Sequence, residues 1–318
     1  QFFSLLQSSD TVLKLLVDIV GVAPRLSAWL SRNAQLVDIL IETRPLSHDA
    51  DDVEADSGLD FADILDSVRL DVHHSQFRVG VFLLANPTNF QTAGAQFADI
   101  ARRSISRLLP AAQRDIAARH GGLEHAEMAV IGMGKLGSGE MSLQSDLDLV
   151  IVCDSPDFAK TSDGTKPLAG DVWMARAARR LISGLTVPTQ EGSLYNVDMR
   201  LRPSGNAGPL VTKMSSFTAY QQNDAWTWEH MALTQASVIA GSPELVARLN
   251  AGMAGVICRP RDKRVLADDV AAMRQRLFDH QKMRGPLDVK NGPGGLIDIE
   301  FLVQALILAY AADCPAII

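Results

Sequence analysis

The sequence predicts an α+β fold, with a small mixed sheet and its helices at the centre and further helices on both sides. Two short runs rich in Val and Ile, residues 128–133 and 147–153, are bounded by Gly, Ser and Asp, as buried strands are. Residues 194–201 can place apolar and polar side chains on opposite faces, which predicts a third strand. Elsewhere apolar residues recur every three or four positions, which indicates helices.

Composition limits the class of protein. The chain has 318 residues, of which 47% are hydrophobic, so it can bury a sizeable core in one or two domains. A formal net charge of −7 argues against a nucleic-acid binder, which needs clustered Lys and Arg. Isolated cysteines, no signal peptide and no apolar span of membrane length predict a cytoplasmic protein without membrane contact. Because the chain starts with Gln1 and ends in apolar residues, we expect a fragment of a longer polypeptide.

The first part of the chain, residues 1–84, is predicted to be an N-terminal helical segment or linker. Asp10 is placed to cap one helix, and Pro24 suits the first turn of the next. Residues 47–58 are acidic and polar, which predicts a solvated loop. Residues 59–84 follow as an amphipathic helix, whose apolar stripe must pack on neighbouring elements.

The middle of the chain, residues 85–213, is predicted to form the core, and residues 214–318 a C-terminal helical domain that is truncated. A helix starts near Pro87, before the first strand, and a helix over residues 171–185 separates the second strand from the third. The predicted helices of the C-terminal domain are residues 215–222, 226–240, 243–252, 262–284 and 296–312.

The turn after the first strand has two interpretations. Gly132-x-Gly134-x-x-Gly137 matches a dinucleotide-binding fingerprint, and Asp154 lies near the offset of its ribose-binding acid. That fingerprint requires a crossover helix in a unit of about thirty residues, and residues 137–145 are too few for it. An NAD-dependent oxidoreductase is therefore excluded unless this connector is a crossover helix. The remaining pattern is a strand, a Gly-Ser turn, a short connector and a strand with Asp-x-Asp, which starts a nucleotidyltransferase fold.

Aspartates at two strands predict a metal site. Asp146 and Asp148 share one face at the start of the second strand, where two carboxylates repel each other and need a cation. Nucleotidyl transfer uses two metal ions about 3.5–4 Å apart, which need bridging carboxylates. Asp198 projects from the polar face of the third strand, which we expect to neighbour the second. We therefore predict that Asp146, Asp148 and Asp198 are catalytic metal ligands.

The glycine turn is predicted to bind the phosphates of a nucleotide. Gly137 and Ser138 allow the backbone to approach the β- and γ-phosphates, although an ordinary tight turn would use the same residues. Lys135, Arg200 and Arg202 are candidate counter-charges for the triphosphate or pyrophosphate. Each of these three cations could equally form a structural ion pair.

A second acidic pair, Asp298 and Glu300, is interpreted as structural. On a helix these side chains lie about 200° apart, so they do not readily share one metal ion. Asp298 follows Gly294 and Gly295, where a carboxylate would cap a helix. Trp226 and Trp228 are expected to be core residues rather than groups that stack on a base.

Four blocks of sequence carry a resemblance to a known family: residues 132–150, 196–212, 225–230 and 292–301. The third block reads Ala-Trp-Thr-Trp-Glu-His. Together the blocks resemble the bacterial glutamine synthetase adenylyltransferases. The resemblance implies a polymerase-β-like nucleotidyltransferase core over residues 85–213.

The resemblance also implies an activity. The family transfers AMP from ATP to a tyrosine of glutamine synthetase, with Mg²⁺ or Mn²⁺, and so lowers that enzyme's activity in nitrogen regulation. It implies the metal role for Asp146, Asp148 and Asp198, and the phosphate role for Gly137 and Ser138. The nucleophile would come from glutamine synthetase, and the full-length protein would also respond to the PII nitrogen-signalling protein. Neither a nucleic acid nor a membrane is an expected partner.

Two alternatives remain open. Members of this family carry a second unit that removes AMP by phosphorolysis and has the same Asp-x-Asp arrangement. Residues 203–206 and 225–230 resemble the adenylylating, C-terminal unit, which favours AMP transfer. The other alternative is a catalytically silent module that binds a nucleotide or a partner protein.

Overall fold

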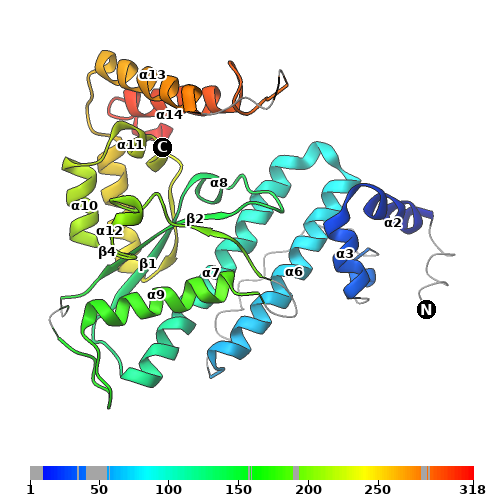
Figure 1. Cartoon of the computed structure of the whole chain (residues 1–318), viewed down its shortest axis with the longest axis horizontal. Coiled ribbons are helices and arrows are strands. Elements are labelled where there is room, and N and C mark those ends of the chain that lie inside the picture. Colours follow the sequence, from blue (N-terminus) through cyan, green and yellow to red (C-terminus); the bar gives the residue numbers. More distant parts are fainter. Residues whose placement is uncertain are drawn as a thin grey trace. The chain divides into compact units, whose positions relative to one another are not determined.

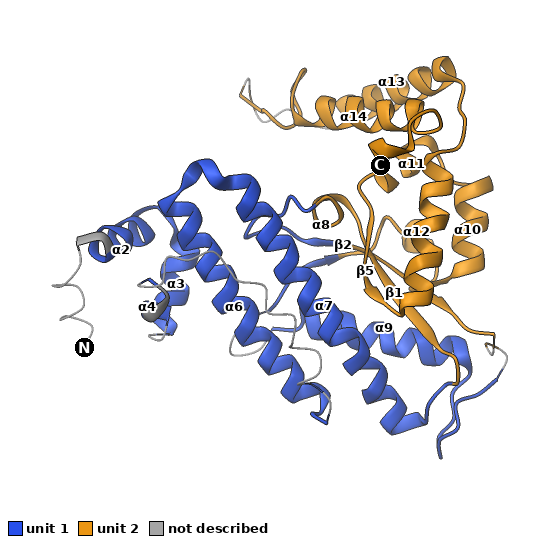
Figure 2. Ribbon diagram, turned by 180° about the vertical axis from the view of Figure 1, so that it is seen from behind, with its two compact units in different colours: residues 1–123, 139–147, 159–197 blue, residues 124–138, 148–158, 198–318 orange. Residues whose placement is uncertain are grey.

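The computed structural model, whose elements are labelled in Figure 1, divides into two compact units (Figure 2). Unit 1 comprises residues 1–123, 139–147 and 159–197, and unit 2 comprises residues 124–138, 148–158 and 198–318. The described residues are 10–33, 36–40, 56, 58–156, 158, 160–188, 193–280, 285 and 287–318. Neither unit is one continuous segment, and the domain boundaries near residues 84 and 213 remain predictions. Helices and a mixed sheet confirm the α+β class.

Unit 1 is built mainly of helices. They are α2 (Asp10–Val22), α3 (Pro24–Arg32), α4 (Leu36–Ile39), α6 (Phe61–Ala85), η1 (Pro87–Asn89), α7 (Phe90–His120) and α9 (Gly170–Thr186). The long helices α6 and α7 pack side by side as a hairpin, and α9 packs on α7 (Figure 2). The Asp60 carboxylate begins α6, because it accepts hydrogen bonds from the N–H groups of Ala62 and Asp63 at 2.8 and 2.9 Å.

The acidic segment before α6 contains a buried ion pair. Asp56 is only 3% exposed, and its two carboxylate oxygens accept hydrogen bonds of 2.9 Å each from Arg107 on α7. Asp71 on α6 binds the same guanidinium. The prediction of a solvated loop is therefore wrong at Asp56, because a distant arginine compensates its charge. Most of residues 47–58 lie outside the described part of the chain.

Unit 2 holds the sheet, apart from the first residues of two strands. The strands are β1 (Glu127–Gly132), β2 (Leu147–Asp154), β3 (Val197–Asp198), β4 (Val211–Lys213) and β5 (Ser237–Gly241). Their order is β3-β2-β1-β5, with β4 also paired to β2. β1 is antiparallel to both β2 and β5, whereas β4 is parallel to β2.

Helices of unit 2 cover and extend this sheet. They are α8 (Gly134–Ser138), η2 (Gly205–Ala207), α10 (Met214–Asn223), α11 (Thr227–Leu233), α12 (Pro243–Ile257), α13 (Lys263–His280), α14 (Leu296–Tyr310) and η3 (Pro315–Ile317). Leu245 and Leu249 of α12 are fully buried in one core with Ile131 and Val150 of the sheet. No helix in the described part of either unit is long and apolar enough to cross a membrane.

Two predicted elements differ from the structure. The strand predicted over residues 194–201 is reduced to β3, because the chain turns at Arg200, which binds back to Asp198. The helix predicted over residues 226–240 is α11 followed by β5. Val238 within β5 is β-branched and pairs with β1, which favours a strand there.

Candidate active site

The connection between β1 and β2 decides between the two interpretations of the glycine turn. The strands are antiparallel, and residues 139–146 between α8 and β2 form no helix. A dinucleotide fold needs parallel strands joined by a crossover helix, so its exclusion is confirmed. Asp154, its candidate ribose acid, instead pairs with Arg248, which also binds Glu127 and so links the ends of both strands.

Asp148 lies on β2 directly against the glycine turn. The Met133 N–H donates a hydrogen bond to the Asp148 carbonyl oxygen at 2.8 Å. Gly134 adopts a φ of +51°, and a Cβ atom there would lie 3.2 Å from Asp148 Oδ2. Glycine therefore satisfies the backbone conformation and leaves room for the carboxylate. Asp148 is half-buried, and Asp146, two residues earlier in the chain, is exposed.

Helix α8 carries the predicted phosphate-binding residues. The Gly137 N–H donates to the Met133 carbonyl at 3.2 Å, and a Cβ atom on Gly137 would lie 1.9 Å from the Gln235 carbonyl oxygen. A side chain at this position would therefore collide with the backbone before β5. Ser138 and Lys135 are exposed. Packing thus explains Gly137, and contact of α8 with phosphates remains a prediction.

Asp198 lies on β3, the neighbour of β2, which confirms the expected adjacency of the two strands. Its carboxylate accepts a hydrogen bond of 2.9 Å from the Arg200 backbone N–H and bonds of 3.0 and 2.7 Å from Arg200 Nε. The Arg200 side chain lowers the pKa of Asp198, an effect that partial burial opposes. Asp198 is thus an ionised group with a cationic partner.

Arg202 stabilises the loop after β3. Its Nη1 donates to the Met199 carbonyl at 2.7 Å and its Nη2 to the Gly208 carbonyl at 3.4 Å, while its buried Nε has no acceptor within the described part of the chain. Ser204 in the same loop has a φ of +61°, which is uncommon for a residue other than glycine. Ser204 belongs to the block at residues 203–206, whose Pro-Ser-Gly run is a recognisable turn signal in the sequence.

The block at residues 225–230 connects α10 with α11. Glu229 is buried and accepts hydrogen bonds from Tyr220 Oη at 2.7 Å and from the Trp226 N–H at 2.9 Å. Trp226 is 67% exposed, so its prediction as a core residue is wrong, whereas Trp228 is half-buried. The Trp226 backbone N–H donates a hydrogen bond to buried Glu229, although Trp226 itself is largely exposed to solvent.

Asp298 has the structural role that we predicted. Its carboxylate accepts a hydrogen bond of 2.6 Å from the Gly294 N–H and pairs with Arg274. Arg274 and then the Gly294 N–H lower the pKa of Asp298. Glu300 is exposed on α14.

The predicted metal ligands Asp146, Asp148 and Asp198 have the right chemistry for a divalent metal, but in this structure their side chains are not arranged around one site. Carboxylate oxygens are the ligands that Mg²⁺ prefers. Within the described ranges, however, no three His, Cys, Asp or Glu side chains form a group that could hold a metal ion. Asp198 is also occupied by Arg200, whose side chain is 74% exposed. Binding through Asp198 would therefore require Arg200 to move away, which its exposure permits.

Comparison with known proteins gives a consistent result. A family model described as glutamate-ammonia ligase adenylyltransferase matches residues 13–252. Three relatives are each described as a bifunctional glutamine synthetase adenylyltransferase/adenylyl-removing enzyme. They are from Brucella suis (42% identical, 99% of this chain, 33% of the relative), Mesorhizobium japonicum (40%, 97%, 32%) and Rhodopseudomonas palustris (38%, 100%, 33%).

The extent of these matches defines what they establish. The chain spans about a third of the length of the curated relatives that it matches. The family match covers most of the chain. It includes α8, β2 and β3, and with them Asp146, Asp148 and Asp198. This chain belongs to the glutamate-ammonia ligase adenylyltransferase family.

Proposed function

We propose that this chain is an adenylyltransferase unit with a polymerase-β-like core, which transfers AMP from ATP to a tyrosine of glutamine synthetase. The observation that carries the proposal is the adjacency of β2 and β3, which bear Asp148 and Asp198. Asp146 precedes Asp148 by two residues and completes the acidic set. The relatives are described as acting on glutamine synthetase, which supplies the protein substrate of this proposal. Modification of the tyrosine would lower glutamine synthetase activity in nitrogen regulation.

The proposed reaction forms one bond and breaks another. The tyrosine oxygen attacks the α-phosphorus of ATP, the bond from that phosphorus to the bridging oxygen breaks, and pyrophosphate leaves. Mg²⁺ or Mn²⁺ held by Asp146, Asp148 and Asp198 would stabilise the charge on the attacking and leaving oxygens. Lys135 and the backbone at Gly137 and Ser138 would contact the phosphates.

Arg200 and Arg202 would have different roles in nucleotide binding. Arg200 pairs with Asp198, and its exposed side chain can rotate toward an anionic ligand. That rotation would release Asp198 as a metal ligand and supply a cation to the triphosphate. Arg202 already binds two backbone carbonyls, so it would mainly hold the loop in place.

Specific observations favour two other functions. The relatives are described as having two activities, AMP transfer and AMP removal. This chain covers about a third of their length. A unit of this kind could therefore remove AMP with phosphate as the attacking group. The Asp198–Arg200 ion pair, in turn, favours a catalytically silent module that binds a nucleotide or a partner.

An AMP-transfer assay with labelled ATP and glutamine synthetase tests the proposal. We expect metal-dependent labelling by the wild-type chain and none by Asp148→Asn, with the fold retained. Asp154→Asn is a matched control on the same strand, because Asp154 binds Arg248 at the strand's other end. Wild-type activity in Asp148→Asn would overturn the metal assignment.

The same assay separates the alternatives. Release of ADP from adenylylated glutamine synthetase with added phosphate would identify the removing unit. ATP binding without either reaction would identify a silent module. For the longer polypeptide we propose a cytoplasmic setting and the PII protein as a further partner, which a pull-down with purified PII would test.

A further inference from the structure

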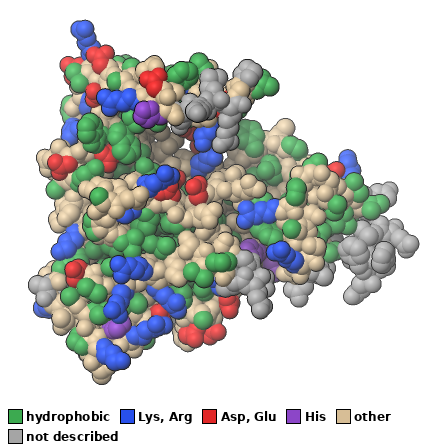
Figure 3. Space-filling view, viewed as in Figure 1, with side chains coloured by type: hydrophobic (Ala, Val, Ile, Leu, Met, Phe, Trp, Pro, Cys, Tyr) green, Lys and Arg blue, Asp and Glu red, His purple; other side chains and the backbone are tan. Residues whose placement is uncertain are grey.

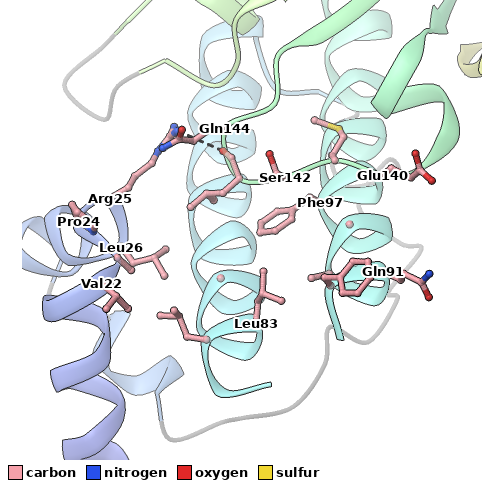
Figure 4. Close-up of a pocket in the computed structure, with 18 of the residues that line it drawn as sticks. Val22, Pro24, Arg25, Leu26, Leu83, Gln91, Phe97, Glu140, Ser142 and Gln144 are labelled. Atoms are coloured by element: carbon pink, nitrogen blue, oxygen red, sulfur yellow. Dashed lines mark hydrogen bonds between the residues drawn. The ribbon is translucent and has the colours of Figure 1, made fainter. Parts of the chain in front are cut away.

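Unit 1 contains a cavity of about 990 Å³ that none of the predicted site residues lines (Figure 4). Its walls are formed by the start of α3, by α6 and α7, and by residues 139–144. Leu26, Phe97 and Met141 are buried in these walls. The volume is at the upper end of the range for small-molecule sites, and an apolar lining is typical of them.

The mouth of the cavity exposes apolar side chains. Val22 at the end of α2 is 71% exposed, and Phe90 at the start of α7 is 65% exposed. Both line the cavity. Large apolar side chains beside an apolar cavity form the kind of patch that marks a binding surface. The body of a ligand is therefore expected to be apolar.

One end of the cavity carries a positive charge. Arg25 lies with its guanidinium carbon 5.2 Å from the centre of the Trp29 ring, and its Nη1 is 3.5 Å from the Leu143 carbonyl oxygen. Among the described residues, no carboxylate forms an ion pair or hydrogen bond with Arg25. Helix α3 also starts here, and its first turn has neither an acid nor a side-chain cap. This end therefore favours an anionic group.

The negative charge at the cavity lies elsewhere. Glu140 projects on the side away from Arg25, near Gln91, whereas Gln144 lies beside Arg25 (Figure 4). Arg25 therefore sets the orientation of a ligand that has one anionic end.

We propose that this cavity binds a small amphipathic carboxylate, with its apolar chain between α6 and α7 and its carboxylate at Arg25. A guanidinium binds a carboxylate through charge-assisted hydrogen bonds, which are stronger than those between neutral groups. The ligand would lie against residues 139–144, which lead directly into Asp146. The site does not depend on the proposed AMP transfer.

Titration calorimetry of the whole chain with decanoate, decanol and acetate tests this proposal. We expect saturable binding of decanoate at one site and no binding of acetate, which lacks the apolar chain. Arg25→Gln should weaken decanoate binding about tenfold, through loss of a charged hydrogen bond, and leave decanol binding unchanged. Arg32→Gln, on the same helix but outside the cavity, is the matched control and should bind decanoate normally.

A second variant tests the cavity itself. Leu83 lines the cavity from α6 and is half-buried, so Leu83→Trp should fill part of the space and weaken both decanoate and decanol. Thermal melting establishes that the variant is folded, and if it is not, the comparison of Arg25→Gln with Arg32→Gln decides. No saturable decanoate binding to the wild-type chain, or equal binding to Arg25→Gln, would overturn the proposal.

Discussion

Two Arg–Asp pairs in this protein have the same chemistry and opposite surroundings. In unit 1, Arg107 pairs with Asp56, and their side chains are 8% and 5% exposed. In unit 2, Arg200 pairs with Asp198, and their side chains are 74% and 17% exposed, so here it is the arginine that faces water. Asp56, as the largest cause, raises the pKa of Arg107 above its ordinary value, whereas Arg200 lowers that of Asp198.

The difference shows which ion pair can take part in function. A buried pair that loses one partner leaves a charge without water, so Arg107 and Asp56 must stay together. The Arg200–Asp198 pair can separate at a lower cost, because water solvates the exposed Arg200 guanidinium and reaches part of the Asp198 carboxylate. Asp198 is therefore free to exchange its arginine for another cation, and Asp56 is not.

The largest expected effect comes from breaking the buried pair. Arg107→Met should lower the free energy of unfolding by about 3–5 kcal/mol, because Asp56 then remains buried and uncompensated. Urea denaturation followed by circular dichroism measures this change. Arg119→Met is the matched control on α7, because Arg119 is exposed and pairs with Asp115 one turn away. The control should cost less than about 1 kcal/mol, and equal losses would refute the role of burial.

A smaller loss of stability is expected at a closely packed position that carries no charge. Gly137→Ala should lower the free energy of unfolding by about 1–3 kcal/mol, because its Cβ atom would meet the Gln235 carbonyl oxygen. Gly255→Ala is the matched control within α12, since among the described residues no atom beyond its chain neighbours and its own helix backbone lies within 4 Å of its Cβ position. The control should stabilise the protein by about 0.5–1 kcal/mol. A neutral Gly137→Ala would mean that α8 can shift away from β5.

The smallest change in stability is expected for the pair of Arg200 and Asp198, whose arginine is exposed. Arg200→Gln should raise the pKa of Asp198 toward its ordinary value, because the Arg200 side chain is the main cause of its lowering. Carboxyl NMR titration measures that pKa. Arg202→Gln should leave the pKa unchanged, because Arg202 binds carbonyls rather than Asp198.

The sign of the stability effect follows from that lowered pKa. A carboxylate with a lowered pKa contributes stability above its unfolded-state pKa, and the contribution is lost as the pH falls through its folded-state pKa. The free energy of unfolding of the wild-type chain should therefore exceed that of Arg200→Gln by less than about 1 kcal/mol at neutral pH. In strong acid the two free energies of unfolding should be equal. A difference that grew as the pH fell would contradict the assignment.

The sequence by itself determined the local features. Short β-branched runs bounded by Gly and Asp predicted β1 and β2, and the length of the connector between them excluded a crossover helix. Asp148 and Asp198 were found as acids on strands, because side-chain alternation depends only on nearby residues. The role of Asp298 was also predicted, because the Gly294 N–H that it accepts from is four residues away.

Only the tertiary structure decided features that depend on residues far apart in the chain. Asp56 lies in a segment whose composition predicts a solvated loop, yet it is buried because Arg107 on α7 pairs with it. Gly137 matched a phosphate-binding pattern, yet the Gln235 carbonyl gives it a packing reason. β5 was hidden in a predicted helix, because its strand conformation depends on pairing with β1. Local propensity is weak, and long-range contacts decide wherever the two compete.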